Sequence, residues 1–520
     1  MKKLPIGKQE FKGLIEGDFV YVDKTDYLVS LAESTIPIFL SRPRRFGKSL
    51  MVNTFKELFR GNKELFRNTF AYTRWDFQQV HPVIRLDLSQ VVGDTARTVE
   101  KQLYELIRDQ AEDFNLTLTE KSAANIALRQ LIKQLGRETP VVILVDEYDA
   151  PILDNLRNPD LLEIKTILRG FYKIIKASEE YIRFVFITGI SKFTHVGIFS
   201  ALNNLEDITL ADQYASILGY TEQEIDTFFS KRINLIREQL GLTEQLFRKK
   251  MASYYNGYSW DGRNFVYNPL SILKFLNNKG KFIPYWMETG SPEYIIRYSE
   301  DKQFDISAFE QLKVSQTFLS KRDIDNASPE SFLTQAGYLT IKQSGEESYT
   351  LDFPNQEVRR SFCELILNAQ YAVADADILG VQSELRKALD ICSIEGIVRQ
   401  FKVIFSSIPY VHFDANKTEH FYTAVLLMYL QAAGFHASAE RLGNKGRLDL
   451  SLHDKENVYL FELKTDSAEK AVQQIVEKNY AGAYANKTVF LIGLQINFSE
   501  RNIIRYLTQD YRQSGATEKK

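Results

Sequence analysis

Three consecutive residues that could bind phosphate, Gly47, Lys48 and Ser49, end the stretch IPIFLSRPRRFGKS, where an apolar run meets a helix-like pattern. A tight turn before a helix N-terminus directs backbone N–H groups at a phosphate, while lysine neutralises charge and a hydroxyl reaches magnesium. The stretch therefore predicts a phosphate-binding loop. Arg44 and Arg45 add two further cations beside the phosphates.

One position departs from such a loop, because Arg42 stands where a glycine usually permits the backbone turn. Pro43 follows it and biases residue 42 towards an extended conformation, so a differently shaped loop entry is expected. Gly-Lys-Ser also arises by chance. The apolar run before it and a helix that Gly61 can end favour the phosphate-binding interpretation.

An acidic pair follows a strand-like run further along the chain, in VVILVDEYD. Asp146 would hold magnesium, and Glu147 would polarise the water that attacks the nucleotide. A third run, FVFITG, ends in Thr188, where a polar side chain could lie near the terminal phosphate. The competing interpretations are that Asp146 and Glu147 are solvated residues at a strand exit, and that Thr188 only forms a turn.

A second set of candidate residues lies in GRLDLSLHDKENVYLFELKT. If DKEN is a turn, His453 pairs with Val458, and the continued ladder places Asp449 opposite Glu462. One end of one hairpin face then carries Arg447, Asp449, Glu462 and Lys464. Two carboxylates suit magnesium or manganese, which can activate water at a phosphodiester, and Lys464 can position that water.

The other face of this hairpin is expected to pack on a core; it carries Leu448, Leu450, Leu452, Tyr459, Phe461 and Leu463. An ordinary amphipathic hairpin with a charged, exposed face is the alternative. Residues around the hairpin favour the metal site: Glu440 upstream, Glu419 in the first turn of the preceding helix, and Gln474 and Lys478 in the following one.

The elements that must position these residues follow from periodicity. Apolar runs such as IPIFL, PVIRLDL and YIRFVFITGIS alternate with helical patterns, which predicts a parallel sheet with helices on both faces. Helical segments rich in Tyr and Phe follow, then a mixed region, and then a helix that Thr418 caps and Gly434 ends. We expect an α/β protein with four domains, over residues 1–220, 221–290, 291–384 and 385–510.

Composition limits the remaining possibilities. The 65 basic and 67 acidic residues nearly balance, so total charge gives no support to nucleic-acid binding, although a local basic face is compatible with it. The two cysteines, Cys363 and Cys392, have no metal-ligand spacing and fit a reducing compartment. The N-terminus lacks a signal-peptide pattern and the apolar runs are too short to span a bilayer, so a soluble cytoplasmic protein without a membrane partner is expected.

Two further groups of residues are interpreted as structural. No helical or hairpin spacing gathers the histidines His195, His412, His420 and His436 into a ligand set. An aromatic run could stack on bases, but packing in a core or between domains is the favoured interpretation; it comprises Tyr254, Tyr255, Tyr258 and Trp260.

Eight motifs in order along the chain carry a resemblance to a known family: VYVDKT, SRPRRFGKSL, LVDEYDAPI, FITGISKF, FSALNNLEDIT, YNGY, YNPLSIL and FPNQEVRRSF. With them, the sequence resembles bacterial AAA-ATPase-like proteins that carry a PD-(D/E)XK nuclease-like domain at the C-terminus. The resemblance implies a P-loop NTPase (AAA-like) sheet domain, a helical lid domain and connector, and an α/β restriction-endonuclease-like domain. The PD dipeptide is replaced by Leu448-Asp449.

Motifs and resemblance together assign roles to the candidate residues. ATP and Mg²⁺ are the expected cofactors, with Mg²⁺ or Mn²⁺ at the nuclease-like site. The expected nucleotide-binding residues are Arg44, Arg45, Gly47, Lys48, Ser49, Asp146 and Thr188, of which Ser49 and Asp146 would hold the metal. The expected catalytic residues are Glu147, Asp449, Glu462, Lys464 and Gln474, and the second metal would be held by Asp449, Glu462 and Glu440.

The leading hypothesis is an ATP-binding protein, with ATPase activity, coupled to a metal-dependent nuclease that acts on nucleic acid. Resemblance to AAA enzymes implies a homo-oligomer in which a neighbouring subunit supplies an arginine finger, since none is evident in the sequence. The first alternative is a nucleotide-operated switch or assembly platform whose nuclease-like domain binds without cutting. The second is a nuclease whose N-terminal domain no longer hydrolyses nucleotide.

Overall fold

The computed structural model describes residues 1–119, 123–192, 202, 204–287, 309–320, 328–415, 418–439, 448–484 and 486–511. The chain divides into two compact units. The first comprises Met1–Trp286 and Gln311–Asn355, and the second Met287–Glu310 and Gln356–Lys520. The last boundary falls inside the region 291–384 that the sequence marks as a connector, and the division into four domains stays a prediction.

A five-stranded, wholly parallel sheet organises the first unit, with the strand order β2-β3-β4-β1-β5. Its strands are β1 (Ile38–Ser41), β2 (Val83–Asp87), β3 (Val141–Asp146), β4 (Ile182–Gly189) and β5 (Glu206–Asp207). The first four coincide with the apolar runs of the sequence, so the predicted parallel sheet is confirmed. Every residue of β3 is buried, as expected of a parallel strand covered on both faces.

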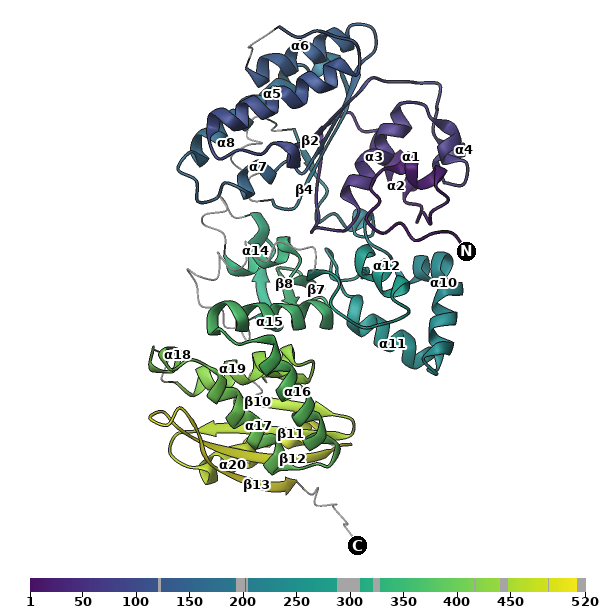
Figure 1. Cartoon of the computed structure of the whole chain (residues 1–520). Helices are drawn as coiled ribbons and strands as arrows, with labels where there is room; N and C mark the ends of the chain where they lie inside the picture. The colour runs from purple at the N-terminus through teal and green to yellow at the C-terminus, as the bar shows by residue number, and fades with distance from the viewer. Residues whose placement is uncertain are drawn as a thin grey trace. The chain divides into compact units, whose positions relative to one another are not determined.

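Helices cover both faces of this sheet. On one side of β2 and β4 lie α5, α6 and α8, and on the other lie α1 to α4 (Figure 1). These and the short α7 are α1 (Phe11–Glu16), α2 (Thr25–Ala32), α3 (Lys48–Phe59), α4 (Ala71–Arg74), α5 (Ala96–Glu112), α6 (Ala124–Gly136), α7 (Ala150–Leu153) and α8 (Leu161–Ala177). The α5, α6 and α8 side is one continuous apolar core, to which β3 contributes Ile143 and Val145.

The rest of the first unit is a helical region and a small antiparallel sheet of order β6-β8-β7. The elements are α10 (Glu222–Gln239), α11 (Glu244–Tyr255), α12 (Pro269–Asn277), α14 (Pro329–Ala336), β6 (Leu312–Ser315), β7 (Thr340–Ser344) and β8 (Ser348–Asp352). A capping box of Thr221 and Glu224 begins α10, and Asn268 caps α12, which starts with Pro269. The aromatic run from Tyr254 to Trp260 is buried, which confirms its interpretation as packing.

The second unit is built on a mixed sheet of order β13-β12-β11-β10-β9. Its strands are β9 (His436–Ser438), β10 (Leu450–Asp454), β11 (Asn457–Lys464), β12 (Thr488–Asn497) and β13 (Asn502–Tyr511). Its helices are α15 (Gln356–Tyr371), α16 (Asp375–Asp390), α17 (Ile394–Ser407), α18 (Tyr410–Ala415), α19 (Glu419–Ala432) and α20 (Ala468–Glu477). Among the helices of the described ranges, none is long and apolar enough to cross a membrane.

Two local predictions for the second unit are confirmed. His453 pairs with Val458 across the β10–β11 hairpin, so the predicted register holds. The Thr418 hydroxyl accepts a hydrogen bond from a backbone N–H in the first turn of α19, and Gly434 follows the helix with a φ of +79°.

The alternative of an ordinary hairpin with a charged, exposed face does not hold at Glu462. Strand β11 is not half of an isolated hairpin, because β12 pairs with it on the other side in parallel. On one face Leu460 packs with Ile475 of α20, and on the other Phe461 meets Phe401 of α17 with ring centroids 4.9 Å apart. Glu462 is therefore 1% exposed rather than solvated.

Candidate functional sites

The loop between β1 and α3 has the backbone turn that a phosphate site needs. Arg45 has a φ of +69° and Gly47, the N-cap of α3, a φ of +100°. Glycine suits this left-handed position, because a side chain there would be strained. The first N–H groups of α3 at Lys48 and Ser49 therefore follow a tight turn, as phosphate binding requires. Arg45 is exposed and Arg44 half-buried.

Lys48 is held by the loop itself. Its Nζ donates to the carbonyl oxygens of Arg42 at 2.9 Å and Pro43 at 3.0 Å, and the residue is 5% exposed. Burial lowers the pKa of Lys48, an effect that the nearby carboxylates of Glu147 and Asp146 oppose. Two of the three N–H donors of Lys48 are therefore directed at its own loop.

Asp146 and Glu147 lie at the carboxyl end of β3, with Lys48 and Ser49 nearby. Asp146 is 1% exposed; its Oδ1 accepts from the backbone N–H of Glu147, and its Oδ2 has no hydrogen-bond partner among the described residues. Burial raises the pKa of Asp146, while the Ser49 hydroxyl and Lys48 counteract it. A buried carboxylate oxygen without a partner, close to a hydroxyl, fits the Mg²⁺ of a bound nucleotide.

Burial also raises the pKa of Glu147, against the effect of Lys48. Its backbone φ of +48° is unusual for a residue with a side chain. Thr188 is fully buried and its hydroxyl donates to the carbonyl of Leu40 at 2.9 Å, so here it links β4 to β1. A contact of Thr188 with the terminal phosphate stays a prediction.

Sequence analysis missed Asp149, the last acid of DEYD. It is fully buried, and its Oδ2 accepts from the backbone N–H of Ser191 at 2.6 Å and the hydroxyl of Ser191 at 2.7 Å. The loop after β3 is thereby tied to the segment after β4. A second acid three residues after Asp146 was the available signal.

The nuclease-like candidates meet at the ends of β10 and β11. The Asp449 carboxylate accepts the backbone N–H of Leu463 at 2.8 Å. Glu462 Oε1 lies 3.2 Å from Lys464 Nζ and also accepts from the side-chain amide of Gln474 on α20. Glu462 Oε2 is buried and has no hydrogen-bond partner within the described ranges. The structure thus brings Asp449, Glu462, Lys464 and Gln474 together.

The charge distribution of this cluster fits a cation. Burial and the neighbouring charge of Asp449 raise the pKa of Glu462 to about 7, with Lys464 acting against them. The pKa of Lys464 is raised: burial opposes this, but the carboxylates of Glu462, Glu419 and Asp449 outweigh it. Two carboxylates, one with a buried oxygen lacking a partner, are hard donors of the kind Mg²⁺ or Mn²⁺ takes.

Other predicted members of this site differ in placement. Glu419 accepts the backbone N–H of Thr465 at 2.8 Å and lies 3.7 Å from Lys464 Nζ, so α19 reaches the cluster. Lys478 is exposed at the end of α20. Glu440 and Arg447 lie outside the described residues. No set of three or more potential metal-binding His, Cys, Asp or Glu side chains occurs in the part of the chain that the structure describes.

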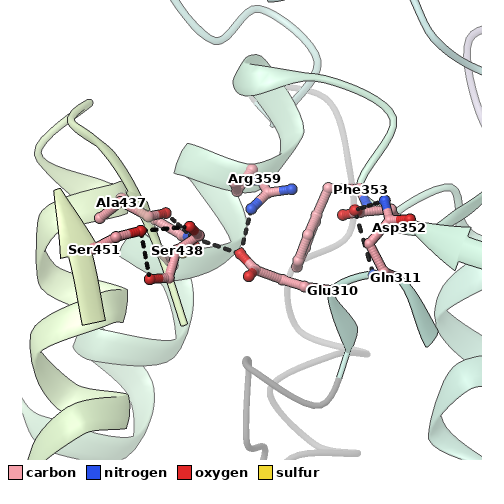
Figure 2. Close-up of polar contacts among 10 residues, drawn as sticks. Glu310, Gln311, Asp352, Phe353, Arg359, Ala437, Ser438 and Ser451 are labelled. Carbon is pink, nitrogen blue, oxygen red and sulfur yellow. Dashed lines mark hydrogen bonds and ion pairs between the residues drawn. The ribbon is translucent and has the colours of Figure 1, made fainter. Parts of the chain in front are cut away.

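A buried polar network fixes the helix and strands behind this cluster. Glu310 accepts from Arg359 of α15 and, at 2.8 Å, from the Gln431 amide of α19 (Figure 2). The same amide donates to the carbonyl of Ala437 in β9 at 3.0 Å. Figure 2 also shows Ser438 of β9 facing Ser451 of β10, with their hydroxyls 2.9 Å apart. Sequence analysis missed this network because its members are far apart in the chain.

The structure describes three of the four histidines that were interpreted as structural, His412, His420 and His436. His195 lies outside the described residues, and His412 and His420 are not part of a metal-binding group of three among the residues that are described. His436 and His453, however, face each other across β9 and β10 with ring centroids 4.8 Å apart. This pair could not be read from sequence spacing, because it arises from strand pairing.

Comparisons with known proteins match families to the two regions that contain the candidate sites. A family described as predicted AAA-ATPase matches residues 5–199, and the PD-(D/E)XK nuclease superfamily matches residues 417–506. The chain is 36% identical over 524 residues to an "Uncharacterized protein in vnfD 5'region" of Azotobacter chroococcum mcd 1. That alignment covers 98% of this chain and 99% of the relative, so the two share their whole arrangement of domains.

Proposed function

The chain belongs to the family of predicted AAA-ATPase-like proteins with a C-terminal PD-(D/E)XK nuclease superfamily domain, and from this premise we propose that it is an ATP-dependent or ATP-regulated nuclease. The proposed substrate is the phosphodiester backbone of a nucleic acid, cut in the second unit. The observation that carries the proposal is the cluster of Asp449, Glu462, Lys464 and Gln474, in which Glu462 is buried and its Oε2 lacks a partner among the described residues.

Each residue of the cluster has a role in this proposal. Asp449 and Glu462 would hold the divalent ion, which when bound supplies Lewis-acid activation of water and stabilises charge on the phosphate. Lys464, whose ammonium is fixed between Glu462 and Glu419, would orient the attacking water. Gln474 keeps Glu462 Oε1 in place, so that Oε2 points to the ion.

The first unit would bind ATP with Mg²⁺ and hydrolyse it. Lys48 and the first N–H groups of α3 would hold the phosphates, Ser49 and Asp146 the metal, and Glu147 the attacking water. Arg44 supports this arrangement, because its charge acts on the pKa of both Lys48 and Glu147. ATP binding would control access of nucleic acid to the second site.

One observation favours a second candidate function, a nucleotide-operated platform that binds nucleic acid without cutting it. Lys464 and Gln474 already occupy Glu462 Oε1, and the described residues contain no third metal ligand beside the two carboxylates. In that case the domain would bind backbone phosphates but lack sufficient metal affinity for chemistry.

The deciding experiment uses the purified full-length protein and several nucleic acids: single- and double-stranded DNA, and RNA. Cleavage is measured with Mg²⁺, with Mn²⁺, with Ca²⁺ and with chelator, each with and without ATP. The proposal expects cleavage with Mg²⁺ or Mn²⁺, little with Ca²⁺ and none with chelator.

Gel-shift binding on the same substrates separates the two candidates. Binding without cleavage under every condition would overturn the nuclease proposal in favour of the platform. Neither binding nor cleavage would overturn both.

A further inference from the structure

The position where a phosphate loop normally has glycine is filled by a cation with its own binding site. The Arg42 guanidinium is fully buried. Its Nη1 donates to the carbonyls of Ser41 at 2.9 Å and Thr209 at 2.7 Å, and its Nη2 to the carbonyl of Tyr214 at 3.0 Å. Backbone carbonyls of β1 and of the segment after β5 thus hold the Arg42 guanidinium in the interior.

An aromatic pair completes this binding site. The guanidinium carbon of Arg42 lies 4.0 Å from the ring centroid of Trp260, a cation–π contact. Phe46, at the other end of the loop, meets Tyr258 and Trp260 edge-on at 4.9 and 5.3 Å between ring centroids. Tyr258 and Trp260, which we call the aromatic brace, therefore contact the loop at both ends.

The brace is itself well fixed. The backbone of Tyr258 exchanges hydrogen bonds with that of Val266 at 3.2 and 2.9 Å. Asp261 closes the turn after Trp260 by accepting from the Ser259 hydroxyl at 3.0 Å and from the backbone N–H of Asn264 at 2.8 Å. A rigid support under a loop can replace the conformational freedom that glycine would otherwise provide.

We propose that Arg42 and Trp260 are positioning residues for nucleotide binding, in a role that rests on the proposed ATP site of the first unit. The contact with the brace fixes the loop so that the N–H groups at the start of α3 converge on the phosphates. It also fixes the Arg42 carbonyl that holds Lys48 at 2.9 Å. When Lys48 moves to a phosphate, the backbone of Arg42 loses that contact, and Trp260 therefore senses nucleotide through Arg42.

The test compares Arg42→Lys, Trp260→Leu and Trp260→Phe with wild type and with the control Trp75→Phe. Trp75 donates its indole N–H to Leu58 at 3.2 Å, away from the loop. Lysine keeps the charge of Arg42 but loses the planar fork that reaches three carbonyls. For each protein the measurements are the thermal midpoint without ligand, the Kd of Mg-ATP, the KM and kcat of ATP hydrolysis, and tryptophan emission on ATP addition.

We expect Arg42→Lys and Trp260→Leu to weaken Mg-ATP binding by about tenfold, mainly through KM, while the folded protein persists. Trp260→Phe should recover part of the affinity, because phenylalanine still offers a ring face to Arg42. ATP should change tryptophan emission in wild type and in Trp75→Phe, and by less in Trp260→Phe.

The outcomes separate this role from the proposed function. Equal Mg-ATP affinity in wild type, Arg42→Lys and a folded Trp260→Leu overturns the positioning role and leaves the ATP site intact. Because Trp286 lies near Pro43 of the loop and also emits, the sensing by Trp260 is overturned if the emission change in Trp260→Phe is as large as in Trp75→Phe. Absence of ATP binding by wild type removes the proposed ATP site and the positioning role with it. If Trp260→Leu does not fold, the Mg-ATP affinities of Arg42→Lys and Trp260→Phe decide whether the positioning role holds.

Discussion

The two candidate sites place a lysine beside a buried acid, but they hold that lysine in opposite ways. Lys48 rests on two backbone carbonyls of its own loop, which a phosphate can replace. Lys464 is fixed by the carboxylates of Glu462 and Glu419, which belong to different elements. A phosphate would compete with backbone carbonyls for the lysine of the first site, whereas the lysine of the second is already paired with the acids of its own site.

Both sites contain one carboxylate oxygen of the same kind, although their lysines are held differently. Asp146 Oδ2 and Glu462 Oε2 are both buried and lack a hydrogen-bond partner among the described residues. Burying an unsatisfied carboxylate oxygen is costly, and a bound cation would remove that cost. The two sites therefore share the oxygen that the proposed metal ion would bind, and they differ in how their lysines are held.

The largest effect is expected from Asp449→Ala, which should reduce metal-dependent cleavage to background. With Asp449 gone, Glu462 alone cannot hold a divalent ion. The control is Asp466→Ala, because Asp466 is an exposed acid nearby that forms an ion pair with Lys470 and accepts the backbone N–H of Ser467. Cleavage by Asp449→Ala at the wild-type rate would show that the activity lies at another site. The cluster around Glu462 could then no longer be compared with the ATP site as a second metal site.

Truncating the support of the second site should have the next largest effect. Phe461→Ala should lower the free energy of unfolding by about 3–5 kcal/mol, because Phe461 is fully buried against Phe401. Val476→Ala, at a side chain that is 49% exposed on α20, should change it by less than about 0.5 kcal/mol. Denaturant titration measures both, and a small effect of Phe461→Ala would contradict a preassembled site.

At the first site, Lys48→Ala should weaken Mg-ATP binding by about tenfold to a hundredfold, the loss of a charged hydrogen bond of about 1.5–3 kcal/mol. Lys56→Ala on the same helix is the matched control, since Lys56 pairs with Glu57 away from the loop. Glu147→Gln should keep binding and lose hydrolysis. Calorimetric titration tests binding, and equal affinity of wild type and Lys48→Ala would contradict the phosphate-loop interpretation.

The smallest effect concerns the far end of the β10–β11 hairpin, where His453 faces cations instead of acids. Burial lowers the pKa of His453 to about 4, and the charges of His436 and Lys487 add to this effect. Tyr484 packs against the His453 ring. The unfolded chain takes up the proton first, so stability should fall as the pH drops from about 6.5 towards 4.

Because His453 is partly exposed, we expect this loss to be about 1 kcal/mol or less after solvent screening. Unfolding of wild type and His453→Gln at pH 7.5 and pH 5 measures the difference between them. A pH dependence that is identical in the two proteins would show that folding does not change the pKa of His453.

Periodicity predicted the parts of the fold that depend on local signals. The strands β1 to β4 were evident as apolar runs, and the β10–β11 register followed from the turn at Lys455. What the sequence could not provide was the neighbour of β11. The parallel partner β12 pairs along the edge of β11, and α20, whose Gln474 donates to Glu462, covers the face that looks polar in the hairpin alone.

The candidate sites were predictable to a similar extent. Lys48, Asp146 and the β10–β11 acids could be chosen because their residue types and spacing carry chemistry. The burial of Arg42 could not, since its partners Thr209, Tyr214 and Trp260 are distant in the sequence. Tertiary contacts of this kind decide whether a cation faces a ligand or the interior.

The order of segments in the two units also bears on inheritance. The chain passes from one unit to the other after Trp286, after Glu310 and after Asn355. A single genetic crossover exchanges everything on one side of a point, so it cannot exchange the whole second unit alone. After a crossover at residue 355, Glu310 and Arg359, which form an ion pair, would come from two different parent chains. Recombination would need all three boundaries, which favours the two units being inherited together.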